Sequence, residues 1–232
     1  MEMDEVDRGD ALRAEVNLIK KSILERFPTF DPEKIYLTPG EVLKALEENE
    51  EIKSFLKMCR EHPPTGAGEG VGLLFPDSNY KPLTEESPDK ALRNLYTAVK
   101  NLRCEDEVII YILSPMLGII PPAFIPKTPN VEFSGLFSYQ VRRRSLPWNA
   151  EAFRKVLDRT AEQVESYLRS HARDHRAWYA IIKKGSIEER IFERVRFEGK
   201  FGIRILYEKR PLSSSYLETR GLLSRILEEM KR

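Results

Sequence analysis

Cysteine and histidine are scarce in this sequence of 232 residues, and their positions exclude several classes of site. The two cysteines, Cys59 and Cys104, are far apart in the chain and form neither a disulfide framework nor a Cys-x-x-Cys pair. The three histidines lack the spacing of metal ligands, so the sequence predicts no structural zinc, no other metal and no cofactor. Walker, Gly-x-Ser-x-Gly and Cys–His nucleophile patterns are also missing.

Long hydrophobic runs are missing as well. The longest, Val108 to Leu113, has the length of a strand, whereas a membrane span needs about 20 apolar residues. The first ten residues, MEMDEVDRGD, are acidic and have no apolar stretch like that of a signal peptide. We therefore expect a soluble, cytoplasmic protein with no membrane partner. With 41% hydrophobic residues the chain has enough apolar side chains for a packed core.

The charges are unevenly distributed along the chain. Residues 1–136 contain 16 basic and 24 acidic residues, and residues 137–232 contain 22 basic and 13 acidic ones. An excess of positive charge in the second half favours contact with a polyanion such as a nucleic acid. The alternative is that the two halves neutralise each other within one fold.

The first part of the chain is predicted to be helical. Apolar residues recur at helical spacing in residues 10–27, and two shorter helices are expected at 39–48 and 52–61. Thr38 and Glu41 form a capping-box pattern, and Pro39 suits the first position of a helix. The glycine-rich loop at residues 62–70 follows a helix and leads into a strand, so we interpret it as a linker and not as a phosphate-binding loop.

From residue 71 onward, strand-like and helical segments alternate. The expected strands are 71–75, 107–113, 131–133, 178–182 and 202–207. The expected helices are 87–102, 150–171, 186–195 and one that follows a cap at 213–215. The strands are continuous apolar runs, which is typical of a sheet covered on both faces. The sequence therefore predicts an α/β fold, a three-layer α/β/α sandwich with a mostly parallel sheet over residues 71–232, preceded by a helical region at residues 1–61.

Two loops of the predicted sheet have residues suited to a site, because ligands meet such sheets at the carboxyl ends of the strands. In the loop 76–88, Asp77, Ser78 and Lys81 offer a carboxylate, a hydroxyl and an ammonium within five residues. These three groups are candidates for moving a proton and orienting an anion. The alternative is that Asp77 and Ser78 cap a turn while Lys81 is solvated.

The second loop, residues 114–130, has five prolines and a glycine that hold an apolar segment in a fixed shape. Such a loop can form the wall of a pocket for a flat heterocycle or a rigid cover over a sheet edge. The candidate pocket residues of the two loops are Pro82, Ser114, Pro115 and Gly118.

A basic and aromatic segment follows at residues 139–148, YQVRRRSLPW. Arginine pairs with phosphate in bidentate geometry, and aromatic rings stack on unpaired bases. We therefore expect Arg142, Arg143, Arg144 and Trp148 to bind nucleic acid. The alternative is a solvated basic face.

Several blocks between about Thr38 and Ile182 resemble the catalytic domain of archaeosine synthase, the archaeal paralogue of tRNA-guanine transglycosylase. These blocks include VGLLFPDSNYKP and EVIIYILSPMLGIIPP, followed by a helix and WYAII, and the resemblance covers about 60% of the chain. The most specific piece is the pattern SP-x-LG-x-x-P at residues 114–121. The resemblance implies a uracil-DNA-glycosylase-like α/β/α fold and a role in tRNA modification.

The sequence departs from the motif of that family at two positions that carry chemistry. The family motif is Pro-Cys-x-x-x-Lys-Pro-Tyr-x-x-Ser-x-x-His, and Pro76, Lys81 and Pro82 match it. Asp77 occupies the cysteine position and Lys90 the histidine position, the tyrosine is absent, and the serine matches only with a one-residue insertion. Loss of the cysteine removes the thiolate with which the family adds an amine to a nitrile-bearing base in tRNA.

Three hypotheses follow from these observations. The first is an RNA-binding module or a partner subunit of a tRNA-modifying enzyme that lacks the amine-transfer chemistry. The second is an enzyme that acts on a modified deazaguanine base in tRNA with Asp77 or Lys81 in place of the thiol. The third is a protein-interaction factor whose acidic, helical N-terminal region binds a basic partner.

Overall fold

The computed structural model describes residues 5–28, 30–61, 70–78, 81–195, 203–207 and 215–231. The chain divides into two compact units. The helical unit comprises residues 1–49 and 130–156, and the sheet unit comprises residues 50–129 and 157–232. These units differ from the segments 1–61 and 71–232 expected from the sequence, because residues 50–61 belong with the sheet and residues 130–156 belong with the N-terminal helices. Most of the expected linker, residues 62–69, lies outside the described residues.

The sheet unit contains one five-stranded sheet with the order β3-β2-β1-β4-β5. Its strands are β1 (Val71–Pro76), β2 (Val108–Ser114), β3 (Gly118–Ile120), β4 (Ala177–Ile182) and β5 (Ile203–Tyr207). All neighbouring pairs are parallel except β2 and β3, which are antiparallel. The predicted α/β class with a mostly parallel sheet is therefore confirmed.

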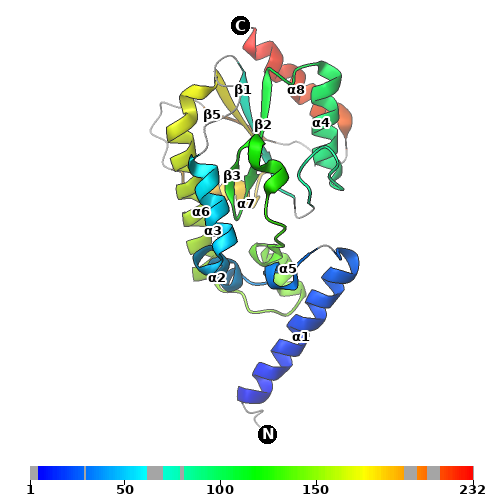
Figure 1. The fold of residues 1–232 in the computed structure, drawn as a ribbon, viewed down its shortest axis with the longest axis vertical. Helices are drawn as coiled ribbons and strands as arrows, with labels where there is room; N and C mark the ends of the chain where they lie inside the picture. The colour runs from blue at the N-terminus through cyan, green and yellow to red at the C-terminus, as the bar shows by residue number, and fades with distance from the viewer. Residues whose placement is uncertain are drawn as a thin grey trace. The chain divides into compact units, whose positions relative to one another are not determined.

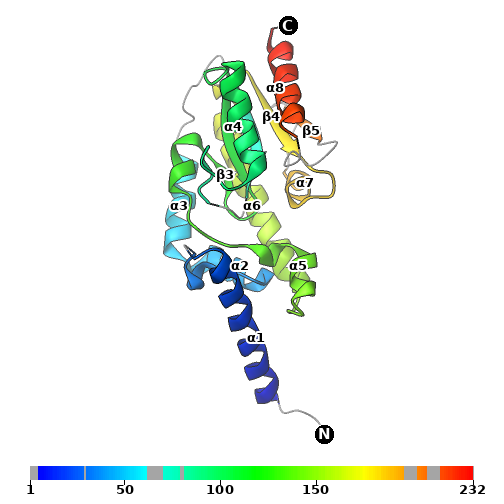
Figure 2. The ribbon, with the colours of Figure 1, turned by 90° about the vertical axis from the view of Figure 1, so that its right-hand side faces the viewer.

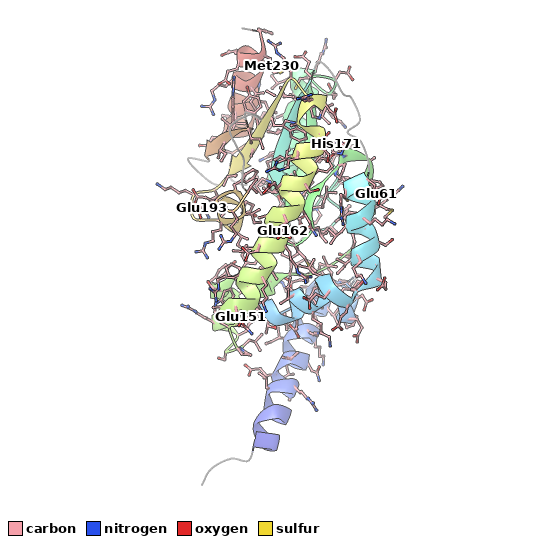
Figure 3. All side chains as sticks on the ribbon, turned by 90° about the vertical axis from the view of Figure 1, so that its left-hand side faces the viewer. Glu61, Glu151, Glu162, His171, Glu193 and Met230 are labelled. Carbon is pink, nitrogen blue, oxygen red and sulfur yellow. The ribbon has the colours of Figure 1, made fainter. Side chains whose placement is uncertain are left out.

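Helices cover both faces of this sheet (Figure 1, Figure 2). They are α3 (Glu50–Glu61), α4 (Lys90–Leu102), α6 (Ala150–His171), α7 (Ile187–Phe192) and α8 (Tyr216–Met230). Adjacent residues of β4 point to opposite faces. Trp178 packs against Tyr167 of α6, whereas the hydroxyl of Tyr179 donates to Glu229 of α8 at 2.9 Å. Figure 3 follows α6 from Glu151 near its start to His171 at its end.

Local sequence signals explain where most of these elements begin. Asn149 Oδ1 accepts from the amide of Ala152 at 2.9 Å, as expected for the cap of α6. Helix α4 begins later than the expected start at residue 87, because Asp89 is its cap: Asp89 Oδ1 accepts from two amides of the first turn, while Ser87 Oγ accepts from the amide of Asp89. The strand expected at 131–133 is wrong, since that segment forms only an isolated bridge between Ile35 and Glu132.

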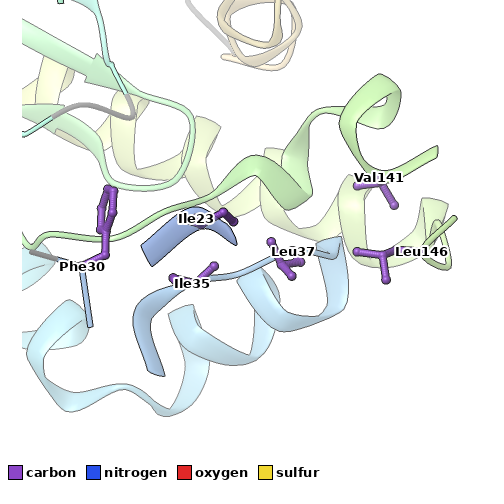
Figure 4. Close-up of a cluster of buried hydrophobic side chains, with 6 residues drawn as sticks. All are labelled: Ile23, Phe30, Ile35, Leu37, Val141 and Leu146. Atoms are coloured by element: carbon purple, nitrogen blue, oxygen red, sulfur yellow. The ribbon is translucent and has the colours of Figure 1, made fainter. Parts of the chain in front are cut away.

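The helical unit contains α1 (Glu5–Arg26), α2 (Pro39–Glu48) and α5 (Ser138–Arg143). The predicted capping box is present: Thr38 Oγ1 accepts from the amide of Glu41, whose carboxylate accepts from the amide of Thr38. Apolar side chains from well-separated segments form the core of this unit (Figure 4). They are Ile23, Phe30, Ile35, Leu37, Val141 and Leu146.

Among the described residues, no helix combines the length and the apolar character that a membrane span requires.

Two glycines of the sheet unit should respond to alanine in opposite ways. A Cβ at Gly72 of β1 would lie 2.5 Å from the ring of Trp178 on the neighbouring strand, so Gly72→Ala should lower the free energy of unfolding by about 1–3 kcal/mol. A Cβ at Gly221 of α8 meets no atom within 4 Å, so Gly221→Ala should raise it by about 0.5–1 kcal/mol. Urea unfolding measures both changes, and a stable Gly72→Ala variant would contradict the packing described.

Candidate functional site

The carboxyl ends of β1, β2 and β4 meet at one edge of the sheet. Strand β1 lies between β2 and β4 and is parallel to both, so the residues that follow these strands lie side by side. The chain passes from β1 to β2 on one side and later returns to β4 on the other, and ligands bind parallel sheets at such a switch point. The polar residues on which the site depends are Asp77, directly after β1, Ser114, the last residue of β2, and Glu188, in the helix that follows β4.

Asp77 and Lys81 form an ion pair that is almost completely buried. The amide of Asp77 donates to the carbonyl of Leu113 at 2.9 Å, which extends the β1–β2 ladder and fixes the start of the loop. Lys81 Nζ donates to Asp77 Oδ1 at 2.8 Å and to the carbonyl oxygen of Ser78 at 2.7 Å. The side chains of Lys81 and Asp77 are 7% and 0% exposed, respectively. The alternative in which the side chain of Lys81 is solvated is therefore wrong.

The second oxygen of Asp77 is buried and accepts no hydrogen bond from the described residues. A buried carboxylate oxygen without a donor is costly, and such groups are commonly satisfied by water or a ligand. Asp77 therefore retains one acceptor position for a donor group at this edge.

Ser78 fastens the loop to the start of α4. Its hydroxyl donates to Asp89 Oδ2 at 3.0 Å, while Asp89 Oδ1 accepts from the amides of Ala91 and Leu92 at 2.8 and 3.1 Å. The hydroxyl proton of Ser78 is thus used to hold the N-cap of α4. The three candidate catalytic residues are close together, but their polar atoms mainly hold the loop.

The second loop begins with a tight hairpin turn between β2 and β3, which packs against α6. Ser114 is fully buried, and its Oγ accepts from the amides of Met116 and Leu117. The carbonyl of Pro115 accepts from Thr160 Oγ1 of α6 at 3.0 Å. Gly118 has a φ of 70°, a conformation that glycine adopts most readily. Ser114 thus shapes the edge of the sheet through its hydroxyl group, and Pro115 and Gly118 do so through their backbone, whereas Pro82 is exposed on the first loop.

Glu188 is a site residue that the sequence analysis missed. It lies in the first turn of α7, directly after β4, and only 9% of it is exposed. Burial raises the pKa of its carboxyl group, and the nearby carboxylate of Asp77 raises that pKa further, while Ser186 and Lys183 oppose the shift. The signal that could have identified Glu188 is its position after the third parallel strand, WYAII.

Neither cysteine supplies a reactive thiolate. Cys59 lies in α3 and Cys104 in the turn after α4, and both are buried. Burial raises the pKa of Cys59 to about 12 and that of Cys104 to about 11, where nearby glutamates add to the effect. At neutral pH both groups are thiols and therefore weak nucleophiles.

The candidate nucleic-acid residues belong to the helical unit and have different surroundings. Arg142 and Arg143 are exposed in the last turn of α5. Arg144 instead donates to Ser134 Oγ at 2.6 Å, and its charge offsets that of the buried carboxylate of Glu132. Only the first two arginines are therefore presented to solvent.

Trp148 is packed within the helical unit and not presented as a stacking surface. Its ring lies 4.9 Å from that of Phe153, and it packs against the apolar core of Figure 4.

The chain was compared with protein-family models, curated proteins and solved structures. Nothing in any of the three sets matches it.

Breaking the buried ion pair between Asp77 and Lys81 should lower the free energy of unfolding. Lys81→Met leaves the Asp77 carboxylate buried without its counter-charge and should lower the free energy of unfolding by about 3–5 kcal/mol. Asp77→Asn introduced into that variant should restore much of the loss. Lys155→Met is the matched control, because Lys155 makes an exposed ion pair with Glu151 at the same i, i+4 spacing and should cost less than about 1 kcal/mol. Equal losses for the two methionine variants in urea unfolding would contradict this account.

Proposed function

We propose that the protein is a cytoplasmic, tRNA-modification-associated protein of the archaeosine-pathway type that binds RNA or a modifying enzyme and lacks the amine-transfer chemistry of that family. The proposal includes the finer fold, a uracil-DNA-glycosylase-like three-layer α/β/α arrangement. The α/β class, the parallel pairing around β1 and the helices on both faces of the sheet support it.

The observation that carries the proposal is the buried ion pair at the position of the family cysteine. A carboxylate is a much weaker nucleophile than a thiolate, and Lys81 holds that of Asp77 in a neutralised pair. Lys90, at the position of the family histidine, is an exposed residue at the start of α4. The two side chains therefore do not reproduce a nucleophile with its proton partner.

A second candidate function is an enzyme that acts on a modified deazaguanine base in tRNA by acid–base chemistry. It is favoured by Glu188, whose buried carboxyl group has a raised pKa beside the carboxylate of Asp77. A buried carboxyl group with a raised pKa in reach of a second carboxylate is typical of a general acid in an acid–base site. In this function Glu188 holds the proton and Asp77 accepts a hydrogen bond from the base.

Incubation with labelled lysine and a tRNA that contains the nitrile-bearing deazaguanine separates the two functions. We expect no label in tRNA from the purified protein. We also expect none from Asp77→Cys, because Lys90 still occupies the histidine position. An active archaeosine synthase serves as the positive control, and filter binding of the same tRNA measures association independently.

Label transfer by the unmodified protein that is lost in Asp77→Ala would contradict the proposal. A change in the modified base that nucleoside mass spectrometry detects without label, and that is lost in Glu188→Gln, would establish the second candidate. Binding of the tRNA with neither change is the result that the proposal predicts.

A further inference from the structure

The short helix α5 presents an aromatic ring and two guanidinium groups on one face. Tyr139 is followed by Arg142 and Arg143 at i+3 and i+4, the spacing at which helical side chains are neighbours. Side chains on a helix lean toward its N-terminus, so both arginines extend over the turn that carries Tyr139. The three residues define the α5 patch.

The tyrosine ring of the α5 patch contacts a row of aromatic side chains. The ring of Phe137 lies 6.2 Å from that of Tyr139 and is stacked on Phe133 at 6.3 Å. Phe133 is 1% exposed and Tyr139 is 65% exposed, so the row leads from the core of the helical unit to solvent. Gln140 Nε2 also donates to the hydroxyl of Tyr139 at 2.9 Å. An exposed ring anchored in this way loses little freedom when another flat ring stacks on it.

The two arginines of the α5 patch have no internal role that would explain them. Within the part of the chain that the structure describes, neither side chain makes a hydrogen bond or an ion pair. Two arginines elsewhere have such partners: Arg144 donates to Ser134, and Arg169 pairs with Glu165. Adjacent like charges without acidic partners repel each other, and a bound polyanion would remove that cost.

We infer that the α5 patch binds a single-stranded segment of RNA, with an unpaired base stacked on Tyr139 and the adjoining phosphates held by Arg142 and Arg143. Stacking on an aromatic ring is open only to a base that has left the duplex, whereas arginine contacts to phosphate serve either form. The inference rests on the RNA binding of the proposed function and adds the kind of RNA and the residue that selects it.

Fluorescence anisotropy with a labelled ten-nucleotide single-stranded RNA and a blunt duplex of the same length tests this inference. Tyr139→Ala should weaken binding of the single strand by about fivefold to a hundredfold and leave duplex binding unchanged, while Tyr139→Phe should stay within about twofold of the unmodified protein. The double variant Arg142→Ala, Arg143→Ala should reduce the slope of log affinity against log salt by about 1.4 for the single strand.

The matched control for charge is Lys57→Ala with Arg60→Ala, which removes two exposed cations at helical spacing from α3. This control should leave the slope near that of the unmodified protein, and circular dichroism confirms that each variant is folded. RNA binding that is insensitive to Tyr139→Ala would overturn the inference and leave the proposed RNA association intact. Failure of the unmodified protein to bind either short RNA would overturn the inference, whereas the RNA association of the proposed function is overturned only if filter binding also shows no association with tRNA.

Discussion

Strand β1 is paired on both sides, and this double parallel pairing is the constraint on which the sheet unit depends. The register places Val71 opposite both Val108 and Ala177, so β1 fixes β2 and β4 at once. Close packing follows, since only glycine at position 72 leaves room for the ring of Trp178. The same pairing places the loops that follow β1, β2 and β4 side by side at one edge of the sheet. The side chains of these loops determine what that edge can bind.

Three ionisable side chains, those of Asp77, Lys81 and Glu188, are buried at that edge of the sheet, and burying each of them costs free energy. A buried lysine and a buried aspartate stabilise each other. A third buried group, Glu188, has a pKa that burial and the Asp77 carboxylate raise, against the opposing effects of Ser186 and Lys183. Buried charges of this kind contribute little to net stability compared with apolar residues, so their presence at a switch point favours a role in binding or catalysis. The thiolate chemistry of the resembling family has no counterpart there, since both cysteines are buried thiols elsewhere.

The sequence predicts the elements whose signals are local and misses the relations that packing creates. The cap of α2 and the strands β1, β2 and β4 follow from a capping box and from continuous apolar runs. Strand β3 has only three residues within a proline-rich loop, so no periodicity reveals it. The effect of Asp77 on the pKa of Glu188 depends on the order of the strands in the sheet, which the sequence does not show. Arg144 differs from Arg142 and Arg143 because Ser134 and Glu132 lie near it in the fold, and spacing along the chain does not show this either.

The central claim is that the segments following β1 and β4 place the buried carboxyl group of Glu188 within electrostatic reach of the Asp77 carboxylate. The direct measurement is the pH titration of the Glu188 side-chain carboxyl carbon by NMR. We predict a pKa above the ordinary glutamate value of about 4.3, and a lower one in Asp77→Asn, because that change removes the neighbouring negative charge. The native state then holds this proton more tightly than the unfolded chain, so Glu188 lowers stability as pH rises from the ordinary value through the raised one. An ordinary pKa that Asp77→Asn leaves unchanged would contradict the account.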